Sequence, residues 1–457
     1  MTTFLFYAAA FLVALGPLVV IHELGHYWVA RLCGVKVLRF SIGFGKPLSK
    51  WVRGADRTEW VLAAIPLGGY VKMLDEREGA VAPEELPRAF NRKNVWQRIA
   101  IVIAGPLANL LMAIVLYWAL FMHGVPGTRP VVGAPVQGSA AAGAGFQAGD
   151  VILSVDGEAV PTWQEARWEL LKHAVRRGSV EVRVTTDDGS TASRKLDMQA
   201  LTANDLDGDF IRILGLSRFQ PRGAPVIASL APGGAAARAE LKAGDEITAI
   251  NNTRVESPDE ATRIIREHPA QAIIIEVRRN GAILSPLQVT PDKITEADGR
   301  VIGRIGAGLQ PAWQSYEKYR VNIRYGPVDS LGKAVLKTWD TAIFSLKMLG
   351  KMVVGEVSLK NLSGPITIAD YAGQSAKMGW IPYITFLALI SISLGVLNLL
   401  PIPLLDGGHL LYYIVEILKG SPVSEFAMEM GQRVGMALLL LMMAFAIYND
   451  LNRLISG

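Results

Sequence analysis

Four apolar segments dominate this sequence, and each is long or nearly long enough to cross a lipid bilayer. A helix needs roughly 20 apolar residues to span the hydrocarbon core, so the segments predict spanning helices, the fourth of them short. No basic residue precedes the first segment and no small-residue cleavage site follows it, which favours a retained helix over a signal peptide. The segments cover residues 4–30, 99–122, 380–400 and 434–448.

The composition predicts that the rest of the chain forms soluble domains connected to these segments. Apolar residues make up 51% of the 457 residues and charged residues 19%, which is too polar for a chain that lies in the membrane throughout. The net charge is +5 without a run of Lys and Arg, so no nucleic-acid partner is expected. Cys33 is the only cysteine, which excludes an internal disulfide and a cysteine-ligated zinc knuckle.

Basic residues near the ends of the apolar segments predict the orientation of the chain. They concentrate between the first two segments, and cytoplasmic loops of membrane proteins carry such an excess. We therefore expect residues 31–98 and 401–433 in the cytoplasm, and the N-terminus and residues 124–379 on the outer side. The residues that carry this argument are Arg31, Lys36, Arg39, Lys46, Lys50, Arg53, Arg92, Lys93 and Arg98.

The region expected outside contains an internal repeat. Residues 138–150 recur without a gap as residues 233–245, and both copies are Ala-rich and end in Ala-Gly-Asp. Each copy continues with the pattern of a strand, a turn, a helix and a second strand, which predicts two tandem domains of one fold. Strands are expected at 151–155, 180–185, 246–250 and 272–278, and helices at 163–172 and 258–267.

Two tandem domains of this size and order resemble the circularly permuted PDZ domains of bacterial envelope proteases. The resemblance implies that a peptide C-terminus binds in a loop before a strand edge, where backbone N–H groups surround the carboxylate. The alternative is that the repeated segments form only a packed helix and a turn. The loops implied in this way are Leu214-Gly215-Leu216 and Ile305-Gly306-Ala307.

The first apolar segment contains His22-Glu23-Leu24-Gly25-His26 near its expected cytoplasmic end. Two histidines four residues apart lie on one face of a helix, so both imidazoles can reach one metal ion. Glu23 is placed to act as a general base. Ionisable groups within a span cost about 2.5–3.5 kcal/mol each, so there they indicate function rather than two core histidines without a metal.

A catalytic zinc site needs a third protein ligand and an open position for water. Asp406 follows two prolines at the end of the third apolar segment and precedes two glycines. A carboxylate in irregular backbone at membrane depth is tolerated where it lines a site. Asp406 could instead cap a helix at 407–418, and His409 is a rival ligand. Because His22 and His26 are present, ligation by Asp406 is the preferred interpretation.

The two motifs together resemble the site-2 protease family of intramembrane zinc metalloproteases. They are the His-Glu-x-x-His above and Asn-x-x-Pro-x-Pro-x-Leu-Asp-Gly, which runs from Asn398 to Gly407. The resemblance covers essentially the whole chain and implies a multi-domain α+β membrane protein. Its parts would be four transmembrane helices, a re-entrant β-hairpin and two circularly permuted PDZ-like domains. The resemblance also implies one Zn²⁺ per chain, with His22, His26 and Asp406 as ligands and Glu23 as the catalytic base.

The resemblance assigns further positions to the substrate. Asn398, Pro401 and Pro403 match positions that handle the substrate helix, and Asn109 ends a motif that begins at Gly105. The alternative for that motif is helix packing and a kink.

The loop between the first two spans contains a strand pattern. Apolar and other residues alternate over 38–45, with a partner expected at 58–65 and a basic turn at 46–57. The family has a re-entrant hairpin here, which offers an edge to an extended substrate. Gly43 and Gly45 would allow close approach of the substrate backbone. An ordinary surface hairpin is the alternative.

The resemblance implies a cut within single-span membrane proteins of the anti-sigma factor type, and within leftover signal peptides, in an envelope stress response. An upstream periplasmic site-1 protease would act first. The protein would lie in the bacterial inner membrane, with the N-terminus and PDZ-like domains periplasmic and the active site near the cytoplasm. The competing functions are a catalytically inert PDZ scaffold and a transporter. The expected domains are a membrane core (1–126), two PDZ-like domains (127–221 and 222–311), an amphipathic helix with a linker on the outer membrane face (312–379) and a second membrane core (380–457). The alternative for the amphipathic helix is that it packs across the core.

Overall fold

The computed structural model describes residues 2–175, 178–199, 201, 205, 209–219, 223–295, 300–311, 318–357 and 364–456. Four described helices are long and apolar enough to cross a membrane, which confirms the four predicted segments. The fourth helix begins at residue 425, well before the predicted start at residue 434. The prediction missed its first turns because they carry the charged residues Glu425, Glu429 and Arg433, and the prediction counted apolar residues only. The four helices are α1 (Thr2–Leu32), α2 (Val95–His123), α12 (Trp380–Asn398) and α14 (Glu425–Ser456).

The described chain divides into two compact units. The membrane unit combines Met1–Val125 with Ile323–Gly457, and the repeat unit is Pro126–Asn322. The two connections between them, β3 (Val125–Thr128) and β17 (Arg320–Ile323), pair with each other. The five predicted domains stay a prediction.

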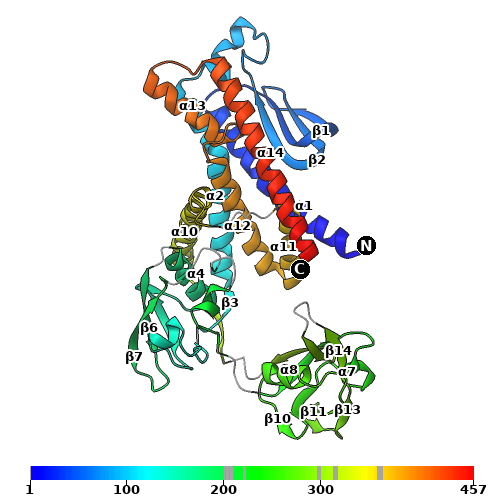
Figure 1. Cartoon of the computed structure of the whole chain (residues 1–457). Helices are drawn as coiled ribbons and strands as arrows, with labels where there is room; N and C mark the ends of the chain where they lie inside the picture. The colour runs from blue at the N-terminus through cyan, green and yellow to red at the C-terminus, as the bar shows by residue number, and fades with distance from the viewer. Residues whose placement is uncertain are drawn as a thin grey trace. The chain divides into compact units, whose positions relative to one another are not determined.

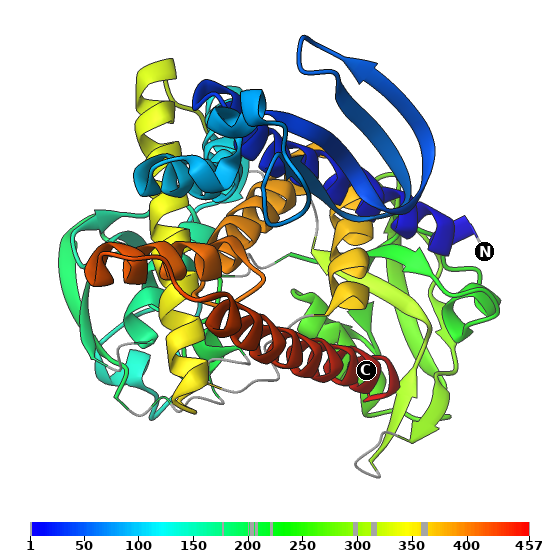
Figure 2. The same cartoon turned by 90° about the horizontal axis from the view of Figure 1, so that it is seen from above.

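In the membrane unit, helices pack around α2, which contacts α1, α10, α12 and α13 (Figures 1 and 2). Ala113 of α2, Ala334 of α10 and Ala388 of α12 are fully buried in one core, so small side chains bring these helices close together. Asn94 caps the first turn of α2 by accepting from the N–H of Gln97. The other helices of this unit are η1 (Pro83–Arg88), η2 (Phe90–Arg92), α10 (Pro327–Val353), α11 (Pro365–Met378) and α13 (Asp406–Lys419).

The predicted hairpin is present but longer than expected. It consists of β1 (Val37–Arg53) and β2 (Thr58–Met73), which pair antiparallel. The turn expected at 46–57 is wrong, because residues 47–53 pair with residues 58–63. Residues 44–53 are all exposed, so neither face of this stretch is buried and the sequence shows no apolar alternation there.

One stretch of the hairpin leaves a strand edge free. Ser41 pairs with both Tyr70 and Val61, so this part of β1 has neighbours on both sides. Residues 69–73 of β2 pair with 37–42 on one side, and the described residues offer no strand for their other side. Because β2 packs against α1, this edge lies beside the helix that carries the two histidines.

The repeat unit contains two domains with separate hydrophobic cores, the first repeat domain (129–219) and the second repeat domain (223–311). Corresponding elements keep the spacing of the sequence repeat. The copies begin with α3 (Ala140–Gly143) and α7 (Ala235–Arg238), and β4 (Val151–Val155) and β9 (Glu246–Ile250) cover the residues predicted for them.

The first repeat domain has a four-stranded sheet in the order β5-β4-β6-β7. In the second, the order is β12-β11-β9-β8-β16, so β16 is an outer strand. The first adds β5 (Glu158–Ala159), α4 (Trp163–Ala174), β6 (Ser179–Thr185), β7 (Thr191–Asp197) and α6 (Phe210–Ile213). The second adds β8 (Pro225–Leu230), β10 (Thr253–Arg254), α8 (Pro258–Arg266), β11 (Ile273–Arg279), β12 (Ala282–Ile283), β13 (Leu287–Val289), β14 (Asp292–Thr295), β15 (Val301–Arg304) and β16 (Ala307–Pro311).

The two loops implied to bind a peptide C-terminus differ in their backbone hydrogen bonds. In the first repeat domain, the N–H groups of Leu214, Gly215 and Leu216 donate to carbonyls of α6. In the second, the carbonyls of Ile305 and Gly306 accept hydrogen bonds, while the described residues include no acceptor for the N–H groups of these two residues. Among the residues that the structure describes, the second loop therefore has N–H groups without an acceptor, and the three N–H groups of the first loop are all used.

Candidate metal centre

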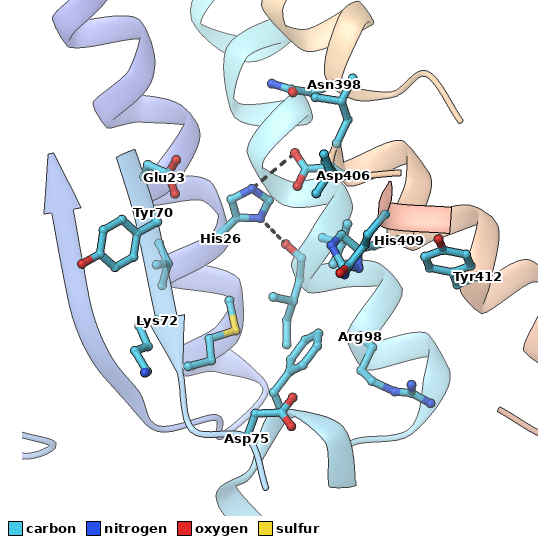
Figure 3. A pocket seen from close by; sticks show the side chains of 18 of the residues that line it. Glu23, His26, Tyr70, Lys72, Asp75, Arg98, Asn398, Asp406, His409 and Tyr412 are labelled. Carbon is cyan, nitrogen blue, oxygen red and sulfur yellow. Dashed lines mark hydrogen bonds and ion pairs between the residues drawn. The ribbon is translucent and has the colours of Figure 1, made fainter. Parts of the chain in front are cut away.

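His22, Glu23 and His26 lie on α1 where α2 and β2 cover it. Nδ1 of His26 lies 2.8 Å from the carbonyl oxygen of Ile101 in α2 (Figure 3). A carbonyl oxygen only accepts hydrogen bonds, so Nδ1 carries the proton and the lone pair of Nε2 is free to bind a metal. Nε2 of His22 lies 3.3 Å from Nε2 of His26. Both rings thus turn a nitrogen toward one point.

Asp406 brings a carboxylate to the same point from the start of α13 (Figure 3). Its Oδ2 lies 3.2 Å from Nε2 of His22 and 3.5 Å from Nε2 of His26. The start of α13 has no side-chain cap, so capping does not account for this residue.

The two glycines after Asp406 allow its placement. A Cβ on Gly407 would lie 2.1 Å from the carbonyl oxygen of Leu400, and one on Gly408 would lie 2.5 Å from that of Ile402. Such contacts are far inside van der Waals distance, so only glycine lets α13 fold back against the loop that follows α12. This contact fixes the first residue of α13 opposite the histidines.

The three side chains fit one zinc ion. Their ligand atoms are separated by 3.2, 3.3 and 3.5 Å, which makes a nearly regular triangle. Tetrahedral zinc with bonds of about 2.0–2.1 Å spaces its ligand atoms about 3.3 Å apart. Oδ2 of Asp406 is buried and has no hydrogen-bond partner among the described residues, as expected of an atom reserved for a cation. Among these residues, the cluster contains His22, His26 and Asp406, and His409 does not belong to it.

Glycines on both helices let α1 and α2 approach each other at this site. A Cβ on Gly25 would lie 2.4 Å from the carbonyl oxygen of Ala104, and one on Gly105 would lie 2.2 Å from Nε2 of His26. Gly105 therefore leaves the space that the His26 ring fills. For Gly105, the structure favours the alternative interpretation of its motif, which is helix packing.

Asn109, at the end of the same motif, contacts the other histidine. Its side-chain Nδ2 lies 3.3 Å from Nδ1 of His22, and the residue is fully buried. The hydroxyl of Ser391 in α12 donates to the Asn109 carbonyl at 2.7 Å. The closest polar contact of the Asn109 side chain is thus with a candidate metal ligand.

A cavity of about 1180 Å³ opens at the three ligand residues. Glu23 lines it, and Figure 3 shows this side chain between the His26 ring and the strand that carries Tyr70. Gly69 of that strand packs over Glu23, since a Cβ there would lie 2.9 Å from its Cγ. The free edge of β2 and the candidate base therefore share one cavity.

The other predicted substrate positions divide into two groups. Asn398 lines the cavity, at the end of α12, as does Asn109. Pro401, Pro403, Gly43 and Gly45 are not among its lining residues. The Pro403 carbonyl faces α14, where a Cβ on Gly435 would lie 2.2 Å from it, and Gly43 closes against the Ile65 carbonyl within the hairpin.

Sequence reasoning missed three contributors to the site: Ile101, Gly69 and the role of Gly105. The first acts through a backbone carbonyl, so its side chain gives no signal. Gly69 follows another glycine within a strand pattern, which is typical of a close backbone approach and could have been noticed.

Comparison with known proteins agrees with this geometry. A family model described as peptidase family M50 matches residues 10–442. This chain belongs to peptidase family M50. It is 43% identical to the regulator of sigma-E protease RseP of Escherichia coli over 99% of this chain and 100% of that protein. It is 46% identical to a Ralstonia nicotianae protein named "Putative zinc metalloprotease" over 97% of this chain and 98% of that protein. One solved structure, a PDZ domain of the SdrC-like protein of Listeria monocytogenes, matches 20% of this chain and 93% of its own, with 20% identity and a TM-score of 0.17.

Membership of the M50 family confirms the predicted resemblance to site-2 proteases. The chain is a zinc metalloprotease and a membrane protein, as its full-length relatives and its four apolar helices together show. The family gives the class of enzyme, and the geometry above gives candidate residues for its chemistry.

Proposed function

We propose that this M50 protease cuts transmembrane segments of single-span membrane proteins, with one zinc ion per chain held by His22, His26 and Asp406. The observation that carries the proposal is the convergence of these three side chains, two on the apolar helix α1 and one at the start of α13, which follows the apolar helix α12. A hydrolytic site at this depth is useful only for a peptide bond that also lies in the membrane.

Each residue at the site has a distinct task. A zinc ion held by these ligands supplies Lewis-acid activation of the scissile carbonyl and of water. Glu23 accepts the proton that water loses on attack and passes it to the leaving amine. His26 keeps its ring fixed through the Nδ1–H donated to Ile101. Glu23 is 8% exposed and lines the same cavity as the three ligand residues.

The substrate is held in extended form beside β2. A transmembrane helix hides its peptide bonds in its own hydrogen bonds and must be unwound before hydrolysis. The free edge of residues 69–73 lines the cavity and can add the unwound segment as a further strand. Asn398 then holds the substrate backbone through its amide, and Pro401 and Pro403 keep the loop that carries it irregular. Gly43 and Gly45 act indirectly, by bending β1 at positive φ.

The hairpin itself enters the membrane as a re-entrant element. Leu48, Trp51 and Val52 near its tip are exposed, and the basic side chains of this stretch suit a lipid headgroup surface. On α10, Leu336 and Trp339 are exposed while Ala334 and Ala342 are buried, which suits a helix at the outer membrane face. The protein then lies in the bacterial inner membrane, with its N-terminus and the repeat unit periplasmic and the zinc site near the cytoplasmic side.

Substrates of the anti-sigma factor type, already trimmed by a periplasmic site-1 protease, fit this arrangement, as do leftover signal peptides. The name of the Escherichia coli relative, regulator of sigma-E protease, supports this class of substrate. The repeat unit, interpreted as two circularly permuted PDZ-like domains, would restrict access to trimmed substrates.

Mapping the cut tests the proposal. Purified full-length protein in liposomes is incubated with a single-span substrate, and the products are identified by mass spectrometry, with zinc-stripped protein as the control. We expect a cut within the apolar segment that requires zinc. A cut confined to the flanking soluble segments would contradict the intramembrane site, and the absence of any cut by zinc-loaded protein would favour the scaffold.

The backbone hydrogen bonds predict that only the second repeat domain binds a peptide C-terminus. A peptide with a free C-terminal carboxylate should bind the full-length protein about 10-fold or more tightly than its amidated form, because charge-assisted hydrogen bonds contribute roughly 1.5–3 kcal/mol. Gly306→Ala should remove this difference, as measured by fluorescence anisotropy. Gly233→Ala is the matched control, because Gly233 shares a positive φ in the same domain and has open space around it. Equal binding of both peptides would contradict the prediction.

A further inference from the structure

The contact between Asn109 and His22 bears on which ring nitrogen of His22 carries the proton. The His22 ring can bind zinc through Nε2 only if its proton sits on Nδ1. Nδ1 then needs an acceptor, yet the Asn109 atom 3.3 Å away is placed as Nδ2, which is a donor. Two donors would face each other at a buried contact. At the same time Oδ1 of Asn109 is buried without a hydrogen-bond partner among the described residues.

Exchanging the two atoms of the amide removes this conflict. The oxygen and nitrogen of an Asn side chain have nearly the same shape, so their assignment follows from the hydrogen bonds they make. With Oδ1 toward His22, the ring donates Nδ1–H to it and presents the lone pair of Nε2 to the metal. After the exchange, Nδ2 takes the position that Oδ1 had, where the described residues offer no polar partner to either atom. The hydrogen bond with the His22 ring is therefore the one contact that distinguishes the two orientations of the amide.

We propose that Asn109 is the positioning residue of His22: its Oδ1 accepts the Nδ1–H of the ring and so fixes the tautomer and orientation of this zinc ligand. Helix α2 then orients both histidines, His26 through the Ile101 carbonyl and His22 through the Asn109 amide. Ser391 holds the Asn109 backbone from α12, which ties the position of the amide to the helix that leads to Asp406. The inference rests on the proposed ligand set and adds to it an amide that touches neither zinc nor substrate.

Zinc affinity tests the inference without reference to proteolysis. It is measured on the full-length protein in detergent by competition with a chromophoric chelator. Asn109→Leu keeps a similar volume and removes the acceptor, so it should weaken zinc binding about 10–100-fold, the usual cost of losing the partner of a ligating histidine. Asn109→Asp keeps an acceptor in the same place and should bind zinc within a few-fold of wild type. Asn398→Leu alters a cavity residue that does not contact His22 and should leave zinc affinity unchanged.

The outcomes separate this inference from the ligand assignment. Wild-type affinity in Asn109→Leu would overturn the inference, as would equal weakening by Leu and Asp, since packing rather than an acceptor would then matter. Thermal melting of the zinc-free proteins identifies a variant that fails to fold. If Asn109→Leu fails to fold, the zinc affinity of Asn109→Asp is compared with that of wild type, and a large loss in Asn109→Asp would overturn the inference. His22→Ala tests the ligand set itself: unchanged zinc affinity there would overturn the proposed site, whereas loss there with an unaffected Asn109→Leu would overturn only the role of Asn109.

Discussion

Glu23→Gln is expected to lower the rate of proteolysis about 10²–10⁴-fold while zinc content stays at the wild-type level. This is the usual contribution of a positioned general base. The amide has the shape of the carboxyl group and fits between β2 and the His26 ring, but it cannot accept a proton at neutral pH. Glu23 does not belong to the cluster of three ligand residues, so its replacement leaves the metal in place.

The measurement pairs initial cleavage rates of a single-span substrate with zinc analysis of the same preparation. Glu84→Gln, an equal change at an exposed position in η1, should leave both values unchanged. Cleavage by Glu23→Gln at the wild-type rate would show that another group acts as the base. Loss of zinc in this variant would show that Glu23 maintains the site rather than moving the proton.

The ligand residues could be named from the sequence because each carries its chemistry in its side chain. Two histidines at helical spacing and a carboxylate in irregular backbone are unusual at membrane depth, so His22, His26 and Asp406 stand out without any structure. The structure adds their approach to within 3.5 Å, which depends on the packing of helices far apart in the chain. The sequence of residues 1–30, which contains both histidines, does not by itself predict that Asp406 approaches them.

The positions around the ligands could not be assigned for the opposite reason. Ile101 holds His26 through a backbone carbonyl that every residue possesses, and Gly105 acts through the side chain it lacks. The resemblance to the family motif assigns Asn109 to the substrate, and a motif does not say which neighbour a side chain meets. Such roles are set by the crossing of α1 and α2, not by a local pattern.

The same difference between local pattern and tertiary packing explains which strands the sequence predicts. Strands β6 and β11 bury alternate residues, so their alternation marks them, and each lies within one residue of its predicted range. Residues 47–53 also form a strand, but all are exposed and many are basic or polar, which is typical of a turn. Where no other part of the protein covers a strand, burial within the chain does not shape its sequence, and alternation is no guide.

Gly105→Ala is expected to weaken zinc binding by about 100-fold, with a comparable loss of proteolysis. The added Cβ would lie 2.2 Å from Nε2, 2.6 Å from Cε1 and 2.8 Å from Cδ2 of His26, so it meets the ligand atom itself. The ring is buried and held by Ile101, and it can move away only by giving up that hydrogen bond. Loss of the orientation of a ligating histidine costs 10–100-fold in affinity, and displacement of its nitrogen belongs at the upper end.

Gly16→Ala is the matched control, because Gly16 lies in α1 and nothing surrounds the position of its Cβ within 4 Å. Alanine favours a helix over glycine by about 1 kcal/mol, so this variant should keep zinc affinity and melt at the same or a higher temperature. Both variants add one methyl group to a membrane helix, and they differ in whether that group meets a ligand. Wild-type zinc affinity in Gly105→Ala, measured by chelator competition, would mean that His26 can reach the metal from another ring position. The tight contact between α1 and α2 would then be a matter of packing alone and would not hold the metal ligands in place.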